Sequence, residues 1–241
     1  MEEIKKTERQ IIMPRVINLN FICTGNTCRS YIAEAFAANL LKTVYFKKKP
    51  ELKNILSIGS AGTDVLSTDV PPNTYRVLDL FEVPKIYFKP KALDIKTILN
   101  SDALITMATT HKRNILSRFA DVDSKKIFNL LELSNIVLYL QSEDIFKRDF
   151  LDKETNNEMG NPQIKNLLTD LLKAPKAETG LSFHAKIFHR ILVLKNTASM
   201  EIVKPPIIDV EDPYGRSVDI YIQVAKIIKE SIIIIFDYLF N

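Results

Sequence analysis

The stretch Val-Ile-Asn-Leu-Asn-Phe-Ile-Cys-Thr-Gly-Asn-Thr-Cys-Arg-Ser, residues 16–30, carries the strongest structural signal in the chain. Its first half is short, apolar and rich in β-forming residues, as a buried parallel strand is. After it, apolar side chains recur at helical spacing and predict an amphipathic helix over residues 31–47. A helix start has unpaired backbone N–H groups, and its dipole favours negative charge. The loop over residues 23–30 is therefore predicted to bind an anion.

The side chains of this loop suit phosphate chemistry. Cys23 ends the strand, and an electropositive setting favours its nucleophilic thiolate form. Arg29 offers a planar fork that can grip two phosphate oxygens. Gly25 permits a backbone conformation that other residues resist, and Asn26 can brace the loop by hydrogen bonds to its own backbone. Ser30 can donate a hydrogen bond to the thiolate and help the sulfur to leave later.

A second segment, Glu211-Asp212-Pro213-Tyr214, can supply the acid that such a reaction needs. Asp212 would protonate the leaving atom and then act as base for the water that hydrolyses phosphocysteine. The predicted catalytic residues are therefore Cys23, Arg29 and Asp212. The predicted substrate- and phosphate-binding residues are Thr24, Gly25, Asn26, Thr27, Cys28, Ser30 and Tyr214.

Further strands are expected at residues 55–58, 103–107 and 126–130, and further helices at 71–80, 109–119 and 217–239. This alternation predicts an α/β fold with a parallel sheet covered by helices on both faces. Residues 136–204 break the rhythm and are predicted to be a helical insertion, with helices at 164–172 and 183–194. The expected organisation is a flexible lead-in over 1–15, a main domain over 16–135 and 205–241, and the insertion over 136–204. Three roles stay open for the insertion: a lid, a surface that reads the substrate, or neither.

The composition narrows the class of protein. The 33 Lys plus Arg against 29 Asp plus Glu give a charge of +4, which fits an anionic ligand without requiring nucleic acid. Two cysteines are too few for a disulfide scaffold or a four-cysteine zinc site. The charged start lacks a signal core, and the longest apolar run, Ile232–Phe236, is too short to span a bilayer. We therefore expect a cytoplasmic protein with no membrane or nucleic-acid partner.

Three segments together resemble the low-molecular-weight protein tyrosine phosphatase family: the loop Cys-x-Gly-Asn-x-Cys-Arg-Ser, Ser60-Ala61-Gly62-Thr63, and Asp212-Pro213-Tyr214. The resemblance covers roughly residues 16–135 and 205–241. It implies a three-layer fold with a four-stranded parallel sheet, no metal and no organic cofactor. It also implies Cys23 as nucleophile, Asp212 as acid and base, a phosphorylated protein as substrate and inorganic phosphate as product.

Two substrates stay open, phosphotyrosine and phosphoarginine. The loop also resembles that of bacterial protein arginine phosphatases, which carry Thr at the position of Thr27, where tyrosine-specific members carry a bulkier aliphatic residue. A Thr hydroxyl can meet a guanidinium group, and a polar contact of this kind discriminates strongly when the wrong ligand leaves it unpaired. In the family, a cysteine at the position of Cys28 can form a reversible disulfide with the nucleophile, a role left open here.

Two other classes of function compete with a phosphatase. An arsenate reductase on the same fold would need resolving cysteines beyond the loop, and the chain has none outside residues 23–30. A non-catalytic phosphoprotein-binding module would be expected if Cys23, Arg29 or Asp212 were missing, and all three are present. Tyr31 departs from the family, which usually has Pro there. His111 is expected to be structural or solvent-facing.

Overall fold

The strand that precedes the loop lies inside a four-stranded sheet. A computed structural model describes residues 15–84, 88–119, 122–151, 182–198 and 209–241. The strand order is β2 (Leu56–Gly62), β1 (Ile17–Cys23), β3 (Ala103–Thr106) and β4 (Ile127–Asn129). All neighbouring pairs are parallel, with Cys23 opposite Gly62 and Ile22 opposite Thr106. Parallel strands need helical crossovers, which explains the alternation seen in the sequence. The predicted α/β fold is confirmed.

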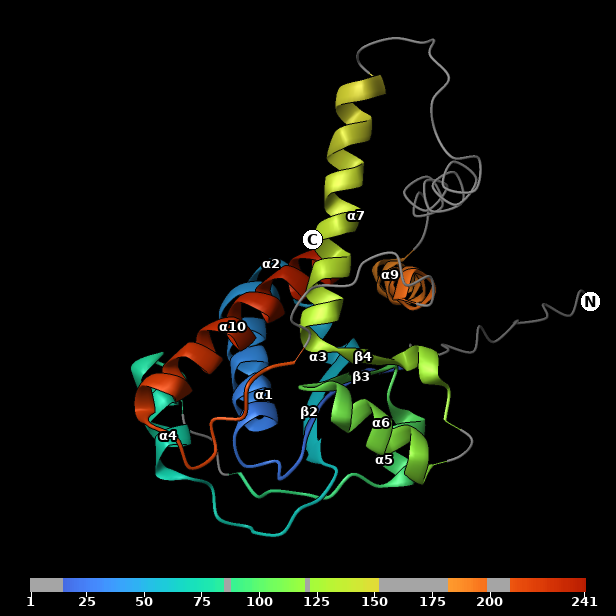
Figure 1. Ribbon diagram of the computed structural model, residues 1–241. Coiled ribbons are helices and arrows are strands. Elements are labelled where there is room, and N and C mark those ends of the chain that lie inside the picture. The colour runs from blue at the N-terminus through green and yellow to red at the C-terminus, as the bar shows by residue number, and fades with distance from the viewer. Residues whose placement is uncertain (1–14, 85–87, 120–121, 152–181, 199–208) are drawn as a thin grey trace, which may run out of the picture.

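Alternate side chains of β1 enter two separate cores. Phe21 and its odd-numbered neighbours join the larger core, which includes α1 (Arg29–Leu40) and α10 (Val218–Phe240). Ile22 joins a smaller core with side chains of α5 (Ile95–Asn100) and α6 (Thr109–Arg118). Helices therefore cover both faces of the sheet, and the three layers are visible in Figure 1.

Several element bounds differ from the predictions. The helix expected over 31–47 begins at Arg29 and continues after Leu40 as a π-helical turn, η1 (Leu41–Tyr45), and α2 (Phe46–Lys48). The strand expected at 55–58 runs on to Gly62. The helix expected at 71–80 is α4 (Pro72–Leu80). Three short elements, α3 (Leu52–Ile55), α5 (Ile95–Asn100) and η2 (Ser124–Lys126), were not predicted.

The predicted boundary at residue 136 lies inside a continuous helix, α7 (Leu130–Leu151), which extends away from the sheet in Figure 1. The helix expected at 183–194 is α9 (Phe183–Ala198). Its Ile187, Ile191 and Leu194 belong to the same core as α10. The lead-in up to residue 14 and the helix expected at 164–172 lie outside the described residues, so the proposed division into domains stays a prediction.

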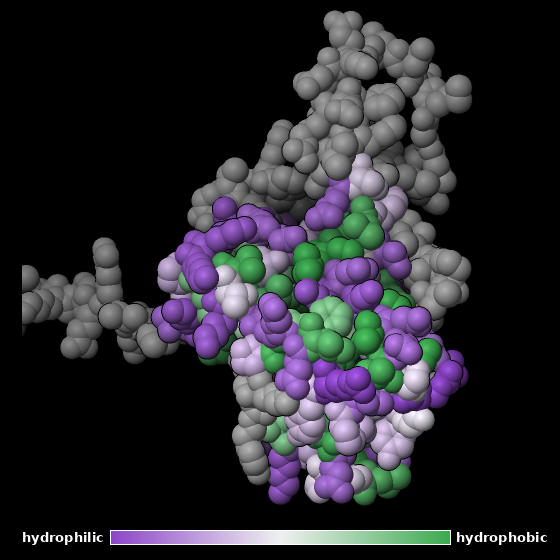
Figure 2. Space-filling view, turned by 90° about the vertical axis from the view of Figure 1, so that its left-hand side faces the viewer, coloured by the Kyte–Doolittle hydropathy of each residue, from purple (hydrophilic) through white to green (hydrophobic). Residues whose placement is uncertain are grey.

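The surface over α4 and α10 mixes polar and apolar groups. Leu80 of α4 and Ile227 of α10 are exposed, and Figure 2 shows apolar side chains divided by polar ones on this face. Among the described helices, none is both long and apolar enough to cross a membrane.

Candidate active site

The loop over residues 23–30 is fastened to the end of β2. The carbonyl oxygen of Cys23 accepts a hydrogen bond from Thr63 N at 2.9 Å, and that of Thr24 accepts one from Asp64 N at 2.9 Å. A Cβ at Gly62 would lie 2.4 Å from the Thr24 carbonyl oxygen and 3.0 Å from Asn26 N. The loop therefore passes so close to β2 that only glycine fits there. This explains the Ser-Ala-Gly-Thr segment seen in the sequence.

Asn26 is the centre of a buried hydrogen-bond network. Its backbone takes a left-handed conformation with φ of 57°. Its Nδ2 donates to Ser30 Oγ at 2.9 Å and to Ser60 Oγ at 2.8 Å, and its Oδ1 accepts from Lys91 N at 3.0 Å. Both amide hydrogens are thus used, so each serine oxygen acts as an acceptor here and each hydroxyl hydrogen points elsewhere.

The hydroxyl hydrogen of Ser30 points to the nucleophile. Ser30 Oγ lies 3.0 Å from Cys23 Sγ, and since Ser30 accepts from Asn26, it donates to the sulfur. The backbone N–H of Asn26 also points at Cys23 Sγ, at 3.3 Å. Two hydrogen-bond donors and the amino terminus of α1 therefore meet at the sulfur of Cys23.

On the far side of Asn26, Ser60 Oγ donates to Glu34 Oε2 at 2.5 Å. Burial raises the pKa of Glu34, although the hydrogen bond from Ser60 and the charge of Lys91 oppose this. The network therefore runs from a half-buried carboxylate on α1 to the sulfur at the end of β1 and holds the loop in one arrangement. Sequence reasoning did not identify Glu34 or Ser60 as parts of the site, because their partners are known only from the fold.

Arg29 is only 5% exposed, and one of its three guanidinium nitrogens has no hydrogen-bond partner among the described residues. Its Nη1 donates to the carbonyl oxygen of Val210 at 3.2 Å, and its Nη2 donates to Asp212 Oδ2 at 2.5 Å. Its Nε is buried and finds no acceptor among the described residues. Buried N–H groups are rarely left unpaired, so this donor is suited to an oxygen of a bound anion.

The segment that carries Asp212 is anchored by a residue that sequence reasoning missed. Asp209 Oδ1 accepts from Thr109 N at 2.7 Å, from Thr109 Oγ1 at 2.6 Å and from Asn129 Nδ2 at 3.2 Å. Burial raises the pKa of Asp209, but these hydrogen bonds outweigh it and hold the pKa below its usual range. Val210 N also donates to the carbonyl oxygen of Met107 at 2.8 Å. These bonds tie the segment to the ends of β3 and β4.

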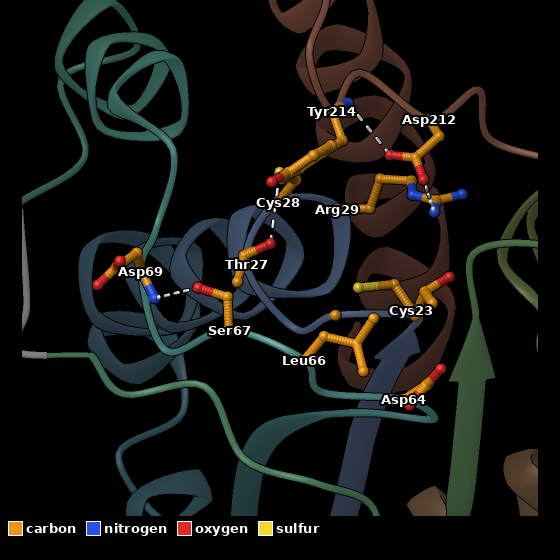
Figure 3. A pocket seen from close by; sticks show the side chains of 12 residues that line it. Cys23, Thr27, Cys28, Arg29, Asp64, Leu66, Ser67, Asp69, Asp212 and Tyr214 are labelled. Carbon is orange, nitrogen blue, oxygen red and sulfur yellow. Dashed lines mark hydrogen bonds and ion pairs between the residues drawn. The ribbon is translucent and has the colours of Figure 1, made fainter.

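A cavity of about 290 Å³ brings the predicted residues together (Figure 3). Asp212 and Tyr214 lie on one side of it and Leu66 on the other, with Cys23 between them. Asn26 and Ser30 are fully buried and do not line the cavity, but their hydrogen bonds hold the loop in place. The wall formed by the loop after β2 was not predicted. The lining residues are Cys23, Thr24, Gly25, Thr27, Cys28, Arg29, Asp64, Leu66, Ser67, Asp69, Asp212 and Tyr214.

Cys28 is a buried free thiol, as is Cys23. Burial raises the pKa of Cys28, although hydrogen bonds from Tyr221, Thr74 and Thr27 oppose this. Its Sγ lies 3.3 Å from Tyr221 Oη. Burial therefore favours the thiol form of Cys28, which lies in the same loop as Cys23. A reversible disulfide between the two stays a prediction.

Tyr31, at the start of α1, is fully buried. Its ring stacks on Phe88 with centroids 3.7 Å apart and meets the edge of Tyr75 at 6.2 Å. Aromatic pairs of this kind add to the stability that burial alone provides. Packing therefore holds the start of the helix where a proline would hold it through its fixed φ.

Comparisons with known proteins agree with this fold. The family model of the low molecular weight phosphotyrosine protein phosphatases matches residues 18–147. The low molecular weight protein-tyrosine-phosphatase PtpB of Staphylococcus haemolyticus is 33% identical over 116 residues, which cover 48% of this chain and 73% of PtpB. An α/β protein with this loop and sheet order is thus placed in a class of phosphate-binding enzymes. The chain belongs to the low-molecular-weight phosphotyrosine protein phosphatase family, a family of hydrolases.

Solved structures are similar in fold. A YwlE mutant from Bacillus subtilis matches with a TM-score of 0.54 and 19% identity, covering 93% of this chain and 99% of that chain. A low-molecular-weight phosphotyrosine phosphatase from Vibrio cholerae matches with a TM-score of 0.56 and 14% identity, covering 92% and 95%. The YwlE arginine phosphatase from Geobacillus stearothermophilus matches with a TM-score of 0.50 and 17% identity, covering 92% and 91%. At these identities the likeness concerns the fold.

Proposed function

We propose that this chain is a protein phosphatase that removes the phosphoryl group of phosphotyrosine through a phosphocysteine on Cys23. One observation carries the proposal: the sulfur of Cys23 receives two hydrogen bonds in the cavity that also holds Arg29 and Asp212. A cysteine sulfur that accepts two hydrogen bonds, beside a buried cation and a carboxyl group, is the set that transfer of a phosphoryl group to sulfur requires.

In the first step, backbone N–H groups of the loop and the free Nε–H of Arg29 hold the phosphoryl oxygens. The Cys23 thiolate attacks phosphorus, so that an S–P bond forms while the bond from phosphorus to the leaving oxygen breaks. Asp212 gives its proton to that oxygen. In the second step, water attacks phosphorus, the S–P bond breaks, Asp212 takes the proton of the water, and inorganic phosphate leaves.

Because Arg29 and Asp212 form an ion pair, Asp212 must leave Arg29 before it can act as the acid. Asp212 can donate a proton only when it is protonated, and in the structure its Oδ2 lies 2.5 Å from Arg29 Nη2. A phosphoryl dianion competes for the same guanidinium donor. The half-exposed side chain of Asp212 is then released from Arg29 and free to turn toward the leaving atom.

The test compares turnover of para-nitrophenyl phosphate and of phosphotyrosine peptides by the wild type and by two variants. Cys23→Ser should be inactive, and acid-quenched wild type should carry phosphate on Cys23 by mass spectrometry. Asp212→Asn should lower kcat by about 100-fold or more, whereas its matched control Asp219→Asn, exposed at the start of α10, should not. A wild type as inert as Cys23→Ser would instead favour the non-catalytic binding module.

Phosphoarginine is the second candidate substrate. Thr27 lines the cavity, as the resemblance to arginine phosphatases requires, and Asp64 and Asp69 are also among its lining residues. Carboxylates form strong hydrogen bonds with a guanidinium group. Phosphoarginine and phosphotyrosine peptides should therefore be assayed side by side, with Thr27→Ile as the variant. A strong tyrosine preference in the wild type, unchanged by Thr27→Ile, would refute the argument from Thr27.

A further inference from the structure

His111 lies beside the candidate active site, although the sequence alone assigned no function to it. It belongs to the first turn of α6 and is only 3% exposed. Its Nε2 lies 3.0 Å from Oγ1 of Thr24, the residue that follows the nucleophile. Its Nδ1 is buried and has no hydrogen-bond partner among the described residues.

These contacts decide which nitrogen carries the proton. Burial, and then the charge of Arg29, lower the pKa of His111 to about 4, although Asp212 and Asp209 oppose this. At neutral pH the ring is therefore uncharged and has a single N–H. A buried N–H without an acceptor is rarer in proteins than a buried acceptor without a donor. The proton consequently belongs on Nε2, which donates it to Thr24 Oγ1, and the unpartnered Nδ1 keeps only a lone pair.

This direction has a consequence for Thr24. A hydroxyl group has one hydrogen, and since the Thr24 oxygen accepts from His111, that hydrogen cannot point back at the ring. Thr24 lines the same cavity as Cys23 and Arg29. Its hydrogen is therefore available to a group inside the cavity, where the equatorial oxygens of the phosphoryl group carry the negative charge of the transition state.

Resting on the proposed function, we propose that His111 is a positioning residue for phosphoryl transfer. It donates from Nε2 to Thr24 and thereby turns the Thr24 hydroxyl toward the phosphoryl group. Thr24 then stabilises the transition state as one further donor beside Arg29 and the backbone of the loop. If the proton were on Nδ1 instead, the Thr24 hydroxyl would have to donate to the unprotonated Nε2 and could not donate to the phosphoryl group.

Kinetics of four variants test this arrangement. Thr24→Val should lower kcat by about 10-fold, with KM changed by no more than about twofold, because one donor to the transition state is lost. A Gln side chain can place an amide near the position of Nε2, whereas Asn places one near Nδ1. His111→Asn should therefore lower kcat as Thr24→Val does, and His111→Gln should recover most of it. The double variant His111→Asn/Thr24→Val should be no slower than Thr24→Val alone.

Three kinetic results would overturn the inference: an unaffected Thr24→Val, an effect of His111→Gln as large as that of His111→Asn, or single-variant effects that multiply in the double variant. Thermal melts of every variant separate these results from loss of fold. A wild type without turnover would overturn the proposed function itself. An active wild type whose Thr24 variant is equally active would overturn only the role of His111.

A second measurement does not depend on turnover. Long-range ¹H–¹⁵N spectra of the full chain report the tautomer of each histidine ring, and the signals absent from His111→Gln assign those of His111. The expected result at pH 7 is a neutral ring with the hydrogen on Nε2. A ring protonated on Nδ1, or on both nitrogens, would overturn the inference.

Discussion

At the scale of single residues, Asn26 sets the direction of the hydrogen bonds around Cys23. It uses both amide hydrogens on serine oxygens, and its carbonyl group is held by Lys91 N. The two serines have matching bonds to Asn26, but only Ser30 touches the sulfur. They therefore offer a comparison in which support of the loop and contact with the nucleophile can be separated.

We expect Ser30→Ala to lower kcat by about 10- to 100-fold, because the thiolate loses a donor both as nucleophile and as leaving group. Ser60→Ala and Ser30→Ala should each lower the free energy of unfolding by about 1–2 kcal/mol. The loss of kcat should be much smaller in Ser60→Ala than in Ser30→Ala. Steady-state kinetics and urea denaturation of the two variants provide the measurement. Equal losses of kcat would contradict the assigned direction of the Ser30 bond.

The buried ring of His111 also predicts how stability depends on pH. Its pKa in the folded chain is about 4, below the usual 6.5, so the folded state resists a proton that the unfolded chain binds. Its contribution is complete above about pH 6.5 and is lost as the pH falls toward 4, by up to about 3 kcal/mol. The free energy of unfolding of His111→Gln should fall less than that of the wild type between pH 7 and pH 4.5. Parallel curves would contradict the lowered pKa.

At the scale of elements, the site depends on how closely the loop after β1 approaches the end of β2. Thr24 and Asn26 leave no room for a side chain at Gly62, whereas a Cβ at Gly59 would meet the end of the Asn20 side chain at 2.5 Å. A side-chain end can turn aside, and a backbone carbonyl oxygen held by other bonds cannot. The two glycines of one strand therefore differ in what they tolerate.

Gly62→Ala should consequently destabilise the fold by roughly 1–3 kcal/mol and lower kcat strongly, since the loop must shift. Gly59→Ala should have a small effect on both, because Asn20 can move. Thermal melts and turnover of para-nitrophenyl phosphate distinguish the two. A Gly62→Ala protein with wild-type kcat would show that the loop tolerates displacement.

At the scale of the whole molecule, α9 belongs to the main core, although it lies within the predicted insertion. Ile191 is buried in the cluster that includes α10, while its neighbour Leu192 is 53% exposed. A helix that shares a core with the sheet should unfold together with it.

Ile191→Ala should therefore cost about 2–4 kcal/mol of stability and keep a single cooperative transition in urea. Leu192→Ala should cost much less, since that side chain is largely in water. Circular dichroism and tyrosine fluorescence should follow the same curve. A second transition in Ile191→Ala alone would show that the insertion is a separate unit.

Much of this architecture follows from local pattern. The spacing of apolar residues and the positions of turn residues predicted the strands, the main helices and the parallel sheet. Side chains that are buried on one face of a strand or helix recur at a regular spacing in the sequence. Cys23, Arg29 and the loop around them were also recognisable, because the residues of this motif lie close together in the sequence. The long helix α7 was missed because its start is occupied by a run that reads equally as the end of a strand.

The sequence by itself determined the α/β class and pointed to the candidate anion-binding loop and the candidate nucleophile, cation and acid. Only the tertiary structure decided what lies against them: Asp209 on Thr109 and Asn129, Gly62 under Thr24, and the His111 ring beside Thr24. The physical reason is that hydrogen bonds and burial depend on distance in space. Residues 38 to 100 positions apart become neighbours only when parallel strands bring their carboxyl ends to one edge of a sheet.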